Sequence, residues 1–411
     1  MTSRARNLLL ATTALVPLGA TLGATWAGAN PLGAQVVGGS AAVQGQGTAS
    51  VTVTQSSSKA IINWNTFNIA PNESTKFVQP DANAIALNKV VGNLGPSMID
   101  GLLTANGKIF IVNGDGILFG PHAVVNVGSL LATTSDIKNA DFMAGRYNFS
   151  IPGKPDASIV NLGNITAANG GFAALVAPGV RNSGTITATL GTVALAAGNV
   201  FNLDFYGDKL INLAVNDQIA ATVKDVATGK PLDALVKNDG ALRANGGRVE
   251  LTAAAVRVVV DSVINTSGVI EANSIGVKNG VITLSAATGS SKPAGAPAQV
   301  VKVSGNLSAK GSKTGETGGK VTVTGEKIVV SGAQIDASGQ NGGGTVLIGG
   351  DWSGGKPQIG LVNNPSAKLE AQAIPTATTV TVDAASKIDV SATGQGNGGK
   401  AIVWSDGTTT F

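Results

Sequence analysis

Apolar and polar residues alternate along most of this chain. Runs such as Val51-Thr52-Val53-Thr54, Val321-Thr322-Val323-Thr324 and Thr379-Val380-Thr381-Val382 place β-branched apolar side chains at every second position. Residues two apart share a face only in an extended strand, and β-branched residues favour strands. The pattern therefore predicts an all-β fold built from short, half-buried strands.

A phrase of the form Gly-x-Ile/Leu-x-Ala recurs through the chain, at the spacing of solenoid repeats. We expect its central Ile or Leu to point into a core, and its glycine to turn the strand with a positive φ. A single coil cannot bury its inward face, so neighbouring coils must stack. The phrase predicts a right-handed parallel β-helix, and it begins at Gly163, Gly184, Gly240, Gly268 and Gly305 and continues at Ala333 and Ser386.

Two stretches depart from the repeat. Residues 200–235, with Phe201, Phe205, Tyr206 and Asp208, lack the phrase and are predicted to form an excursion beside the coils. Residues 285–299 are rich in Ala, Gly, Ser and Pro, which is typical of a loop or linker. We place a boundary there, between a first unit at 30–290 and further β-helical repeats at 291–411.

The composition fits this architecture and excludes several classes of site. Aromatic residues make up only 4% of the chain, which suits a narrow bore filled by aliphatic side chains. With no cysteine, the chain has neither a disulfide framework nor a thiolate metal site. The net charge is only +4 and the basic residues do not cluster, so no nucleic-acid surface is indicated. No cofactor or metal site is predicted.

The N-terminal 29 residues have the organisation of a signal peptide. Arg4 and Arg6 precede a short apolar run, and Ala27-Gly28-Ala29 matches a cleavage site. The apolar run is too short for a membrane span. We therefore expect cleavage after Ala29 and delivery to the periplasm by the general secretory machinery.

Four segments between residues 60 and 120 resemble the N-terminal two-partner secretion domain of filamentous haemagglutinins and high-molecular-weight adhesins. The resemblance covers roughly residues 30–290 and is looser beyond. Its segments are Ala60-Ile61-Ile62-Asn63-Trp64-Asn65-Thr66-Phe67-Asn68-Ile69, Phe77-Val78-Gln79-Pro80, Ala86-Leu87-Asn88-Lys89-Val90-Val91-Gly92 and the run from Ile99-Asp100-Gly101 to Ile117-Leu118-Phe119-Gly120.

The resemblance implies a route of export. Such exoproteins cross the periplasm, are recognised by the POTRA domains of a dedicated outer-membrane β-barrel, and fold outside the cell. Extended amphipathic segments are able to pair with a sheet edge of the receptor. The implied location is the medium or the cell surface of a Gram-negative bacterium, where glycans or proteins of a host or cell surface are the expected partners.

In that family a motif reading Asn-Pro-Asn-Gly-Ile is usual, and this chain has Asn113-Gly114-Asp115-Gly116-Ile117. Gly and Asp keep the turn chemistry of Pro and Asn. Two interpretations stay open, and they are compatible with each other: the motif stabilises a turn that ends one coil, or it contacts the receptor directly. The interpretation that the motif stabilises the turn is favoured.

Trp64 and Phe67 are the candidate N-terminal cap. They lie in the first resembling segment, and an uncovered end of a β-helix would expose a strand edge that pairs with other chains. Capping is favoured over stacking on a ligand.

The sequence offers little catalytic chemistry. His122 is the single histidine, and it has neither a second His for a metal site nor a Gly-x-Ser-x-Gly elbow for nucleophilic catalysis. The segment from Gly315 to Lys320 fails the phosphate-loop pattern and is predicted to be a corner. Asp336 and Asp389 occupy equivalent repeat positions about two coils apart, and we interpret them as a solvated face.

We therefore predict a two-partner-secreted exoprotein, without enzymatic activity, that serves as an adhesin or haemagglutinin. The alternatives are a β-helical enzyme acting on polysaccharide, and the delivery portion of a cytolysin or contact-dependent toxin. The chain ends in mid-repeat without a cap, so it resembles the N-terminal part of a longer exoprotein or a short member of the class.

Overall fold

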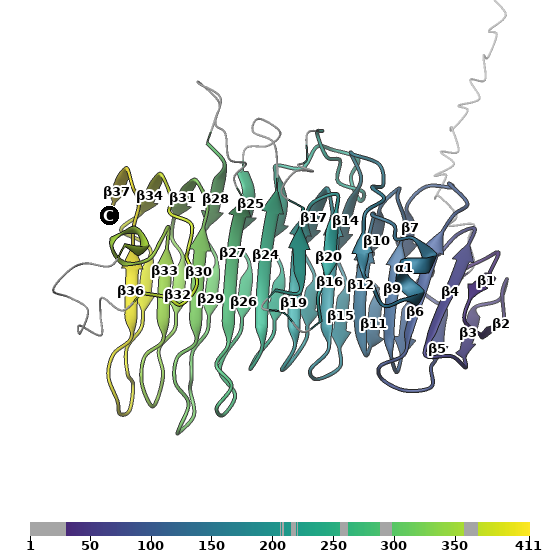
Figure 1. Cartoon of the computed structure of the whole chain (residues 1–411), viewed down its shortest axis with the longest axis horizontal. Coiled ribbons are helices and arrows are strands. Elements are labelled where there is room, and N and C mark those ends of the chain that lie inside the picture. The colour runs from purple at the N-terminus through teal and green to yellow at the C-terminus, as the bar shows by residue number, and fades with distance from the viewer. Residues whose placement is uncertain are drawn as a thin grey trace, which may run out of the picture.

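The computed structural model is an elongated parallel β-helix (Figure 1). The structure describes residues 30–205, 207, 209–214, 219, 221–254, 262–287, 298–356 and 369–411. The predicted signal peptide, with Ala27 and Ala29, lies outside these residues, as do Tyr206 and Asp208. Within the described ranges no helix has the length and apolar character needed to cross a membrane.

Three long sheets run the length of the molecule, and each regular coil contributes one strand to each sheet in turn. Sheet 1 contains β1 (Gln35–Gly38), β4 (Lys59–Trp64), β6 (Ile85–Val90), β9 (Lys108–Val112), β12 (Ser129–Thr133), β16 (Phe172–Ala177), β19 (Thr192–Ala197), β24 (Arg248–Ala254), β27 (Val281–Ala287), β30 (Lys320–Thr324), β33 (Thr345–Ile348) and β36 (Lys400–Val403).

Sheet 2 contains β7 (Ser97–Ile99), β10 (Ile117–Phe119), β14 (Ser158–Asn161), β17 (Gly179–Asn182), β22 (Ala234–Asn238), β25 (Ser262–Thr266), β28 (Val300–Val303), β31 (Lys327–Val330), β34 (Thr379–Val382) and β37 (Thr408–Thr410). Sheet 3 contains β2 (Ala41–Gln44), β3 (Ser50–Gln55), β5 (Ser74–Val78), β8 (Leu102–Ala105), β11 (Val124–Val127), β15 (Asn164–Ala167), β18 (Thr185–Thr187), β23 (Ala241–Arg243), β26 (Val269–Glu271), β29 (Asn306–Ser308), β32 (Gln334–Asp336) and β35 (Lys387–Asp389).

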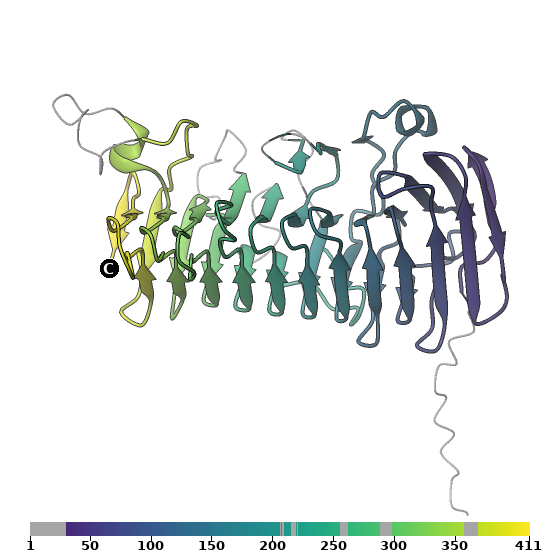
Figure 2. The ribbon, with the colours of Figure 1, turned by 90° about the horizontal axis from the view of Figure 1, so that it is seen from below.

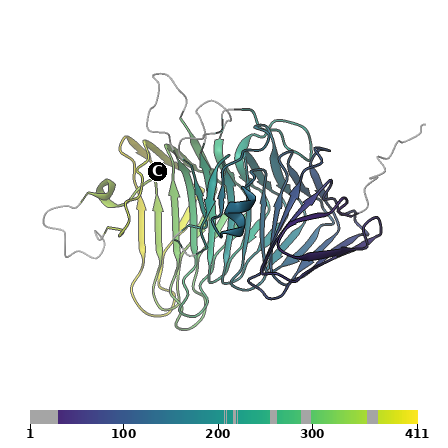
Figure 3. The ribbon, with the colours of Figure 1, turned by 45° about the vertical axis from the view of Figure 1, so that its right-hand side comes forward.

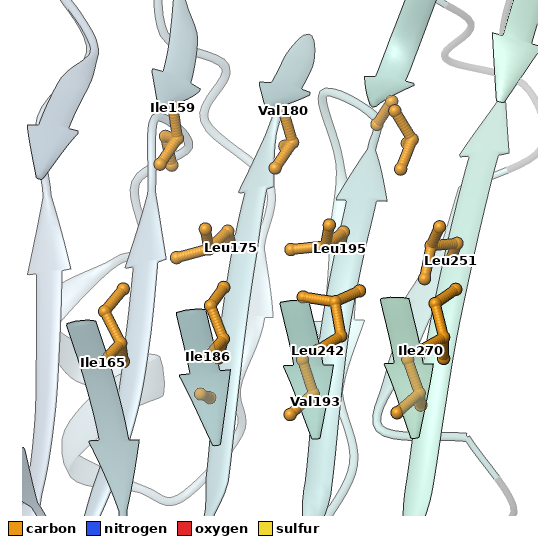
Figure 4. Packing of buried hydrophobic residues seen from close by; sticks show 14 of the residues in the cluster. Ile159, Ile165, Leu175, Val180, Ile186, Val193, Leu195, Leu242, Leu251 and Ile270 are labelled. Carbon is orange, nitrogen blue, oxygen red and sulfur yellow. The ribbon is translucent and has the colours of Figure 1, made fainter. Parts of the chain in front are cut away.

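The bore is filled by stacked columns of aliphatic side chains. Leu175, Leu195 and Leu251 stand in register on sheet 1, and Ile165 and Ile186 belong to the facing column on sheet 3 (Figure 4). All five are at most 1% exposed. The inward direction of the central residue of the repeated phrase, predicted from the sequence, is confirmed.

The role predicted for the phrase glycines was wrong. Gly163, Gly184 and Gly240 do not adopt a positive φ. Instead, a Cβ added at Gly184 would collide with the carbonyl oxygen of Gly163, and one at Gly240 with that of Gly184. These corners need glycine because successive backbones approach too closely for a side chain.

A buried ladder of asparagines precedes these corners on sheet 2. Asn161 donates from Nδ2 to Oδ1 of Asn182 at 2.8 Å, and Asn182 donates in the same way to Asn238 at 2.8 Å. All three side chains are fully buried. The ladder satisfies polar groups that would otherwise be costly to bury.

Three excursions leave the coils where sheet 1 passes to sheet 2, so they stand on the same side of the molecule (Figure 2). The first carries α1 (Asn139–Met143) and β13 (Asn148–Phe149), the second carries β20 (Phe201–Leu203) and β21 (Ile211–Leu213), and the third carries the 3-10 turn η1 (Trp352–Gly355). β13, β20 and β21 form a small antiparallel sheet. The excursion predicted around Phe201 and Phe205 is therefore present.

The first two excursions cover a second hydrophobic core on the outer face of sheet 1. Phe110 projects from β9 into this core and contacts the rings of Phe142, Tyr147, Phe149 and Phe172 at centroid distances of 6.0 to 6.4 Å. Sheet 1 is thus buried on both faces in this region. That explains why its strands are continuously apolar there rather than alternating.

Two antiparallel strands cover the N-terminal end (Figure 3). β1 pairs with β4, and β2 pairs with β3, both antiparallel, whereas the main sheets are otherwise parallel. At the predicted boundary near residue 290 the sheets continue, because β27 pairs with β30 and β25 pairs with β28. The division into 30–290 and 291–411 stays a prediction.

Candidate functional site: the turn at Asn113–Ile117

The motif Asn113-Gly114-Asp115-Gly116-Ile117 forms the tight turn between β9 and β10. The Gly116 N–H donates to the Asn113 carbonyl at 3.0 Å, which closes a four-residue turn. The Asp115 N–H donates to Asn113 Oδ1 at 2.9 Å, so the Asn side chain braces the turn from within. Gly116 has a φ of +114°, a conformation that L side chains rarely adopt.

The turn is tied to the preceding coil through two side chains. Asn113, only 3% exposed, donates from Nδ2 to the Gly95 carbonyl at 3.1 Å and to Ser97 Oγ at 3.0 Å. Asp115 Oδ2 in turn accepts the Gly95 N–H at 3.1 Å. Gly95 is thereby held by both of the motif's polar residues.

The turn is also tied to the following excursion. Lys154 Nζ lies 2.7 Å from Asp115 Oδ1, and the Lys154 N–H donates to the Gly114 carbonyl at 2.9 Å. The hydrogen bond and the charge of Asp115 raise the pKa of the Lys154 ammonium group. The motif therefore links its own coil to the preceding coil and to the following excursion. The side chains of Asn113 and Asp115 are hydrogen-bonded or ion-paired within the fold.

Sequence reasoning identified the motif but missed the partners Gly95, Ser97 and Lys154. They lie about one coil away in sequence and carry no motif of their own. A register of coils, once drawn, would place them beside the turn.

Next to the turn, a strained loop presents apolar side chains to solvent. Leu94 is 71% exposed and Val91 is 49% exposed. Asn93 and Gly95 have φ values of +52° and +98°. The bonds from Asn113 and Asp115 to Gly95 hold this loop in place.

Trp64 and Phe67 lie inside the first coils. Both are fully buried, and their rings meet edge to face at 5.6 Å with an interplanar angle of 82°. Trp64 Nε1 donates to Oδ1 of the buried Asn88 at 3.0 Å. Ala41 and Val43 of β2 pack against the same core. The role of the two rings as the N-terminal cap stays a prediction.

His122 is 67% exposed at its side chain, and its Nδ1 lies 3.0 Å from Asp100 Oδ2. Asp100 Oδ1 also accepts the His122 N–H at 2.8 Å. Among the described residues, no group of three or more His, Cys, Asp or Glu is arranged to hold a metal ion. Gly315 lies in the connection that leads into β30, and Lys320 is the first residue of that strand.

Asp336 and Asp389 are closer than predicted. They pair directly between β32 and β35, in neighbouring coils and not two coils apart, because the third excursion lengthens the intervening coil. Each carboxylate accepts a backbone N–H two residues on, from Ser338 and Ser391 respectively, at 2.9 Å. The bonds from Ser391 lower the pKa of Asp389.

Comparisons with known proteins agree with this architecture. The model of the TPS secretion domain family matches residues 27–298. A heme/hemopexin-binding protein of Haemophilus influenzae strain Rd is 31% identical over 282 residues, which cover 66% of this chain and 29% of the relative. A second protein of that name from Haemophilus influenzae is 30% identical over 259 residues, which cover 57% of this chain and 26% of the relative.

The crystal structure of the HMW1 secretion domain from Haemophilus influenzae superposes with a TM-score of 0.70 at 27% identity, covering 92% of this chain and 98% of that domain. The resemblance to the adhesin secretion domains and the parallel β-helix are therefore confirmed. The matched part spans less than a third of the heme/hemopexin-binding relatives. This chain belongs to the TPS secretion domain family, that of the two-partner-secreted exoproteins.

Proposed function

We propose that this chain is exported through a dedicated outer-membrane β-barrel whose POTRA domains recognise it, and that it acts at the cell surface as an adhesin and not as an enzyme. The observation that carries the proposal is the counterpart of the family motif, built as a braced turn within a β-helix that matches the secretion-domain family over residues 27–298. Stacked coils that fold one upon another outside the cell would bias movement outward.

The contacts of the motif favour a stabilising role over direct receptor contact. Asn113 is buried, and its side chain bonds to Gly95, Ser97 and the backbone of Asp115. Removing such a side chain leaves buried polar groups without partners, which costs about 1–3 kcal/mol. The coil at β9 and β10 would then fold less readily on the far side of the membrane.

The proposal is tested by expressing the full chain in a Gram-negative host with and without its cognate barrel. We expect export only with the barrel, and a severalfold fall in export for Asn113→Ala. Asn126→Ala, at an exposed position of β11, is the matched control and should be exported normally. Appearance in the medium without the barrel would refute the route.

A polysaccharide-active enzyme is less well supported. Catalysis by a carboxylate pair needs one group with a raised pKa to act as the acid. Hydrogen bonds from Ser391 lower the pKa of Asp389, so Asp389 is not suited to act as that acid. We expect Asp336→Asn and Asp389→Asn to leave any polysaccharide cleavage by the purified chain unchanged. A loss of cleavage in either variant would establish the enzymatic alternative.

Haem binding is a second candidate, suggested by the names of the relatives and favoured by one observation. Asp100 orients His122 through Nδ1 and leaves most of the imidazole exposed, as second-shell carboxylates do for metal-ligating histidines. Titration of the purified chain with haemin, followed by the Soret absorbance, tests this. A spectrum that His122→Ala leaves unchanged would remove the candidate.

A further inference from the structure

A groove of about 450 Å³ lies on the outer face of sheet 1, over β24, β27 and β30. Lys209, from the connection between β20 and β21, lies at one side, and residues 371–375 of the third excursion lie at the other. Figure 2 shows this side of the molecule, with the excursions standing on it. The groove shares no lining residue with the turn at Asn113–Ile117.

The floor of the groove marks a change in one column of side chains. From β4 to β19 the column is apolar, with Phe110 and Ala194 among its members. It then becomes Glu250, Thr283 and Thr322, before an apolar residue returns at Leu347. The polar floor therefore lies on β24, β27 and β30, between the second core and the third excursion.

Hydroxyl groups furnish most of this floor. Besides Thr283 and Thr322, the adjoining column contributes Thr252, Ser285 and Thr324. Neighbouring strands in a sheet lie about 4.8 Å apart, so the hydroxyls recur at regular intervals along the groove. Thr322 and Thr324 are buried, and the Thr324 hydroxyl donates to the Leu284 carbonyl at 3.3 Å. The half-buried hydroxyls of Thr252, Thr283 and Ser285 are therefore the groups suited to hydrogen bonds with a polyhydroxylated ligand.

The floor contains a buried carboxylate at its β24 end. Glu250 is 4% exposed, and its Oε1 lies 3.4 Å from Arg248 Nη1 while its Oε2 accepts the Leu210 N–H at 3.3 Å. Burial raises the pKa of Glu250, and the nearby charges and the bond from Leu210 only partly oppose this effect. A buried ionisable group in a cleft carries a cost in stability and is a common mark of a binding site.

The β30 end of the groove contains a second ionic cluster. Lys320 Nζ lies 2.6 Å from Glu370 Oε2, and Lys400 Nζ lies 3.3 Å from Glu370 Oε1. Counting the lining residues alone, the cations Lys209, Arg248 and Lys320 outnumber the carboxylates Glu250 and Glu370. The groove therefore favours a ligand with negative charge.

We propose that this groove binds an acidic saccharide. The hydroxyl floor would bond to the sugar hydroxyls, and Arg248, with Lys209, would hold the sugar carboxylate. The remaining wall, formed by Ala371, Ala373, Ile374 and Pro375, offers an apolar surface to the C–H face of a sugar ring. The inference deepens the proposed adhesive role by naming a ligand class and its site.

The test uses the purified full chain and a panel of oligosaccharides that contain hexuronate or sialic acid, each beside a neutral counterpart of the same length. Isothermal titration calorimetry should detect binding of at least one acidic member and at least tenfold weaker binding of its counterpart. Arg248→Gln and Thr283→Val should each weaken that binding at least tenfold. Thr283→Val keeps the β-branched shape, so it reports on the hydroxyl without disturbing the strand.

Lys327→Gln, on the exposed face of sheet 2, is the matched control and should bind as the unaltered chain does. Absence of binding across the panel, equal binding of neutral sugars, or indifference to both groove variants would overturn the inference. These results do not depend on export, because the protein is purified from the cytoplasm. A result that refutes saccharide binding in the groove can therefore be distinguished from one that refutes the secretion route.

Discussion

The coils before residue 254 and those after residue 298 share one backbone plan but are stabilised differently. On the inner face of sheet 2 a single column runs through Asn161, Asn182 and Asn238 in the first region, and through Val303 and Val330 in the second. Buried amides that bond along the helix axis are thus replaced by valines that simply pack. The same coil geometry is therefore stabilised by hydrogen-bonded asparagines in one region and by packed valines in the other.

The outer face of sheet 1 changes in the opposite sense, from apolar in the first region to polar beyond it. In the first region it is covered by an aromatic core around Phe110, and nine of the ten phenylalanines lie between residues 67 and 205. From Thr283, between the two regions, to Thr322, in the second region, its central column is polar. The first region therefore has specific contacts that one substitution disrupts, whereas the second repeats a generic coil that should tolerate change.

The largest effect is expected at the second core. Phe110→Ala removes a fully buried ring that contacts four others, which costs about 3–5 kcal/mol of unfolding free energy. Thr322→Ala, in the same column, should cost less than about 1 kcal/mol. Urea unfolding of the two variants measures the contrast, and equal losses would show that the two regions are stabilised alike.

The asparagine ladder should give the next effect. Asn182→Val leaves Asn161 and Asn238 each short of a buried partner, at a cost of about 1–3 kcal/mol. Replacing all three asparagines by Val should cost less than the single change, since the second region already stacks valines in this column. Thermal unfolding of the single and triple variants decides this, and additive losses would contradict it.

Sequence patterns predicted the parallel β-helix because the inward Ile and Leu residues recur with the coils, and a column such as Ile165 and Ile186 is visible in the spacing alone. The same spacing misled at Gly184, where the need for glycine comes from the next coil's backbone and not from its own φ. The groove around Glu250 could not be predicted, since it depends on excursions whose path the repeat does not encode. The partners of Asn113 depend on the register of neighbouring coils, which the motif alone does not give.

The buried carboxyl of Glu250, near the end of the first region, should make the stability of the chain depend on pH. Burial raises the pKa of Glu250 above its ordinary value, so the unfolded chain loses this proton at lower pH than the folded one. Stability should therefore decline as pH rises past the ordinary value of a carboxyl, until the folded group also ionises. Glu250→Gln should flatten that decline in melts between about pH 4 and 8, while Glu271→Gln, on sheet 3, should leave it unchanged.

The smallest expected effect lies in the secretion turn, within the first region. A Cβ at Gly114 would meet only ordinary contacts, with Gly153 Cα nearest at 3.4 Å. Gly114→Ala should therefore stabilise the chain by about 0.4–1 kcal/mol, because it restricts the unfolded state. Gly116→Ala should destabilise it, since Gly116 has a φ of +114° and a Cβ there would lie 2.8 Å from the Ser158 carbonyl oxygen. Guanidinium unfolding of the two variants tests whether the turn requires glycine at Gly116 only. If Gly114→Ala lowered the free energy of unfolding as much as Gly116→Ala does, the whole motif would be as constrained as the asparagine ladder and the aromatic core.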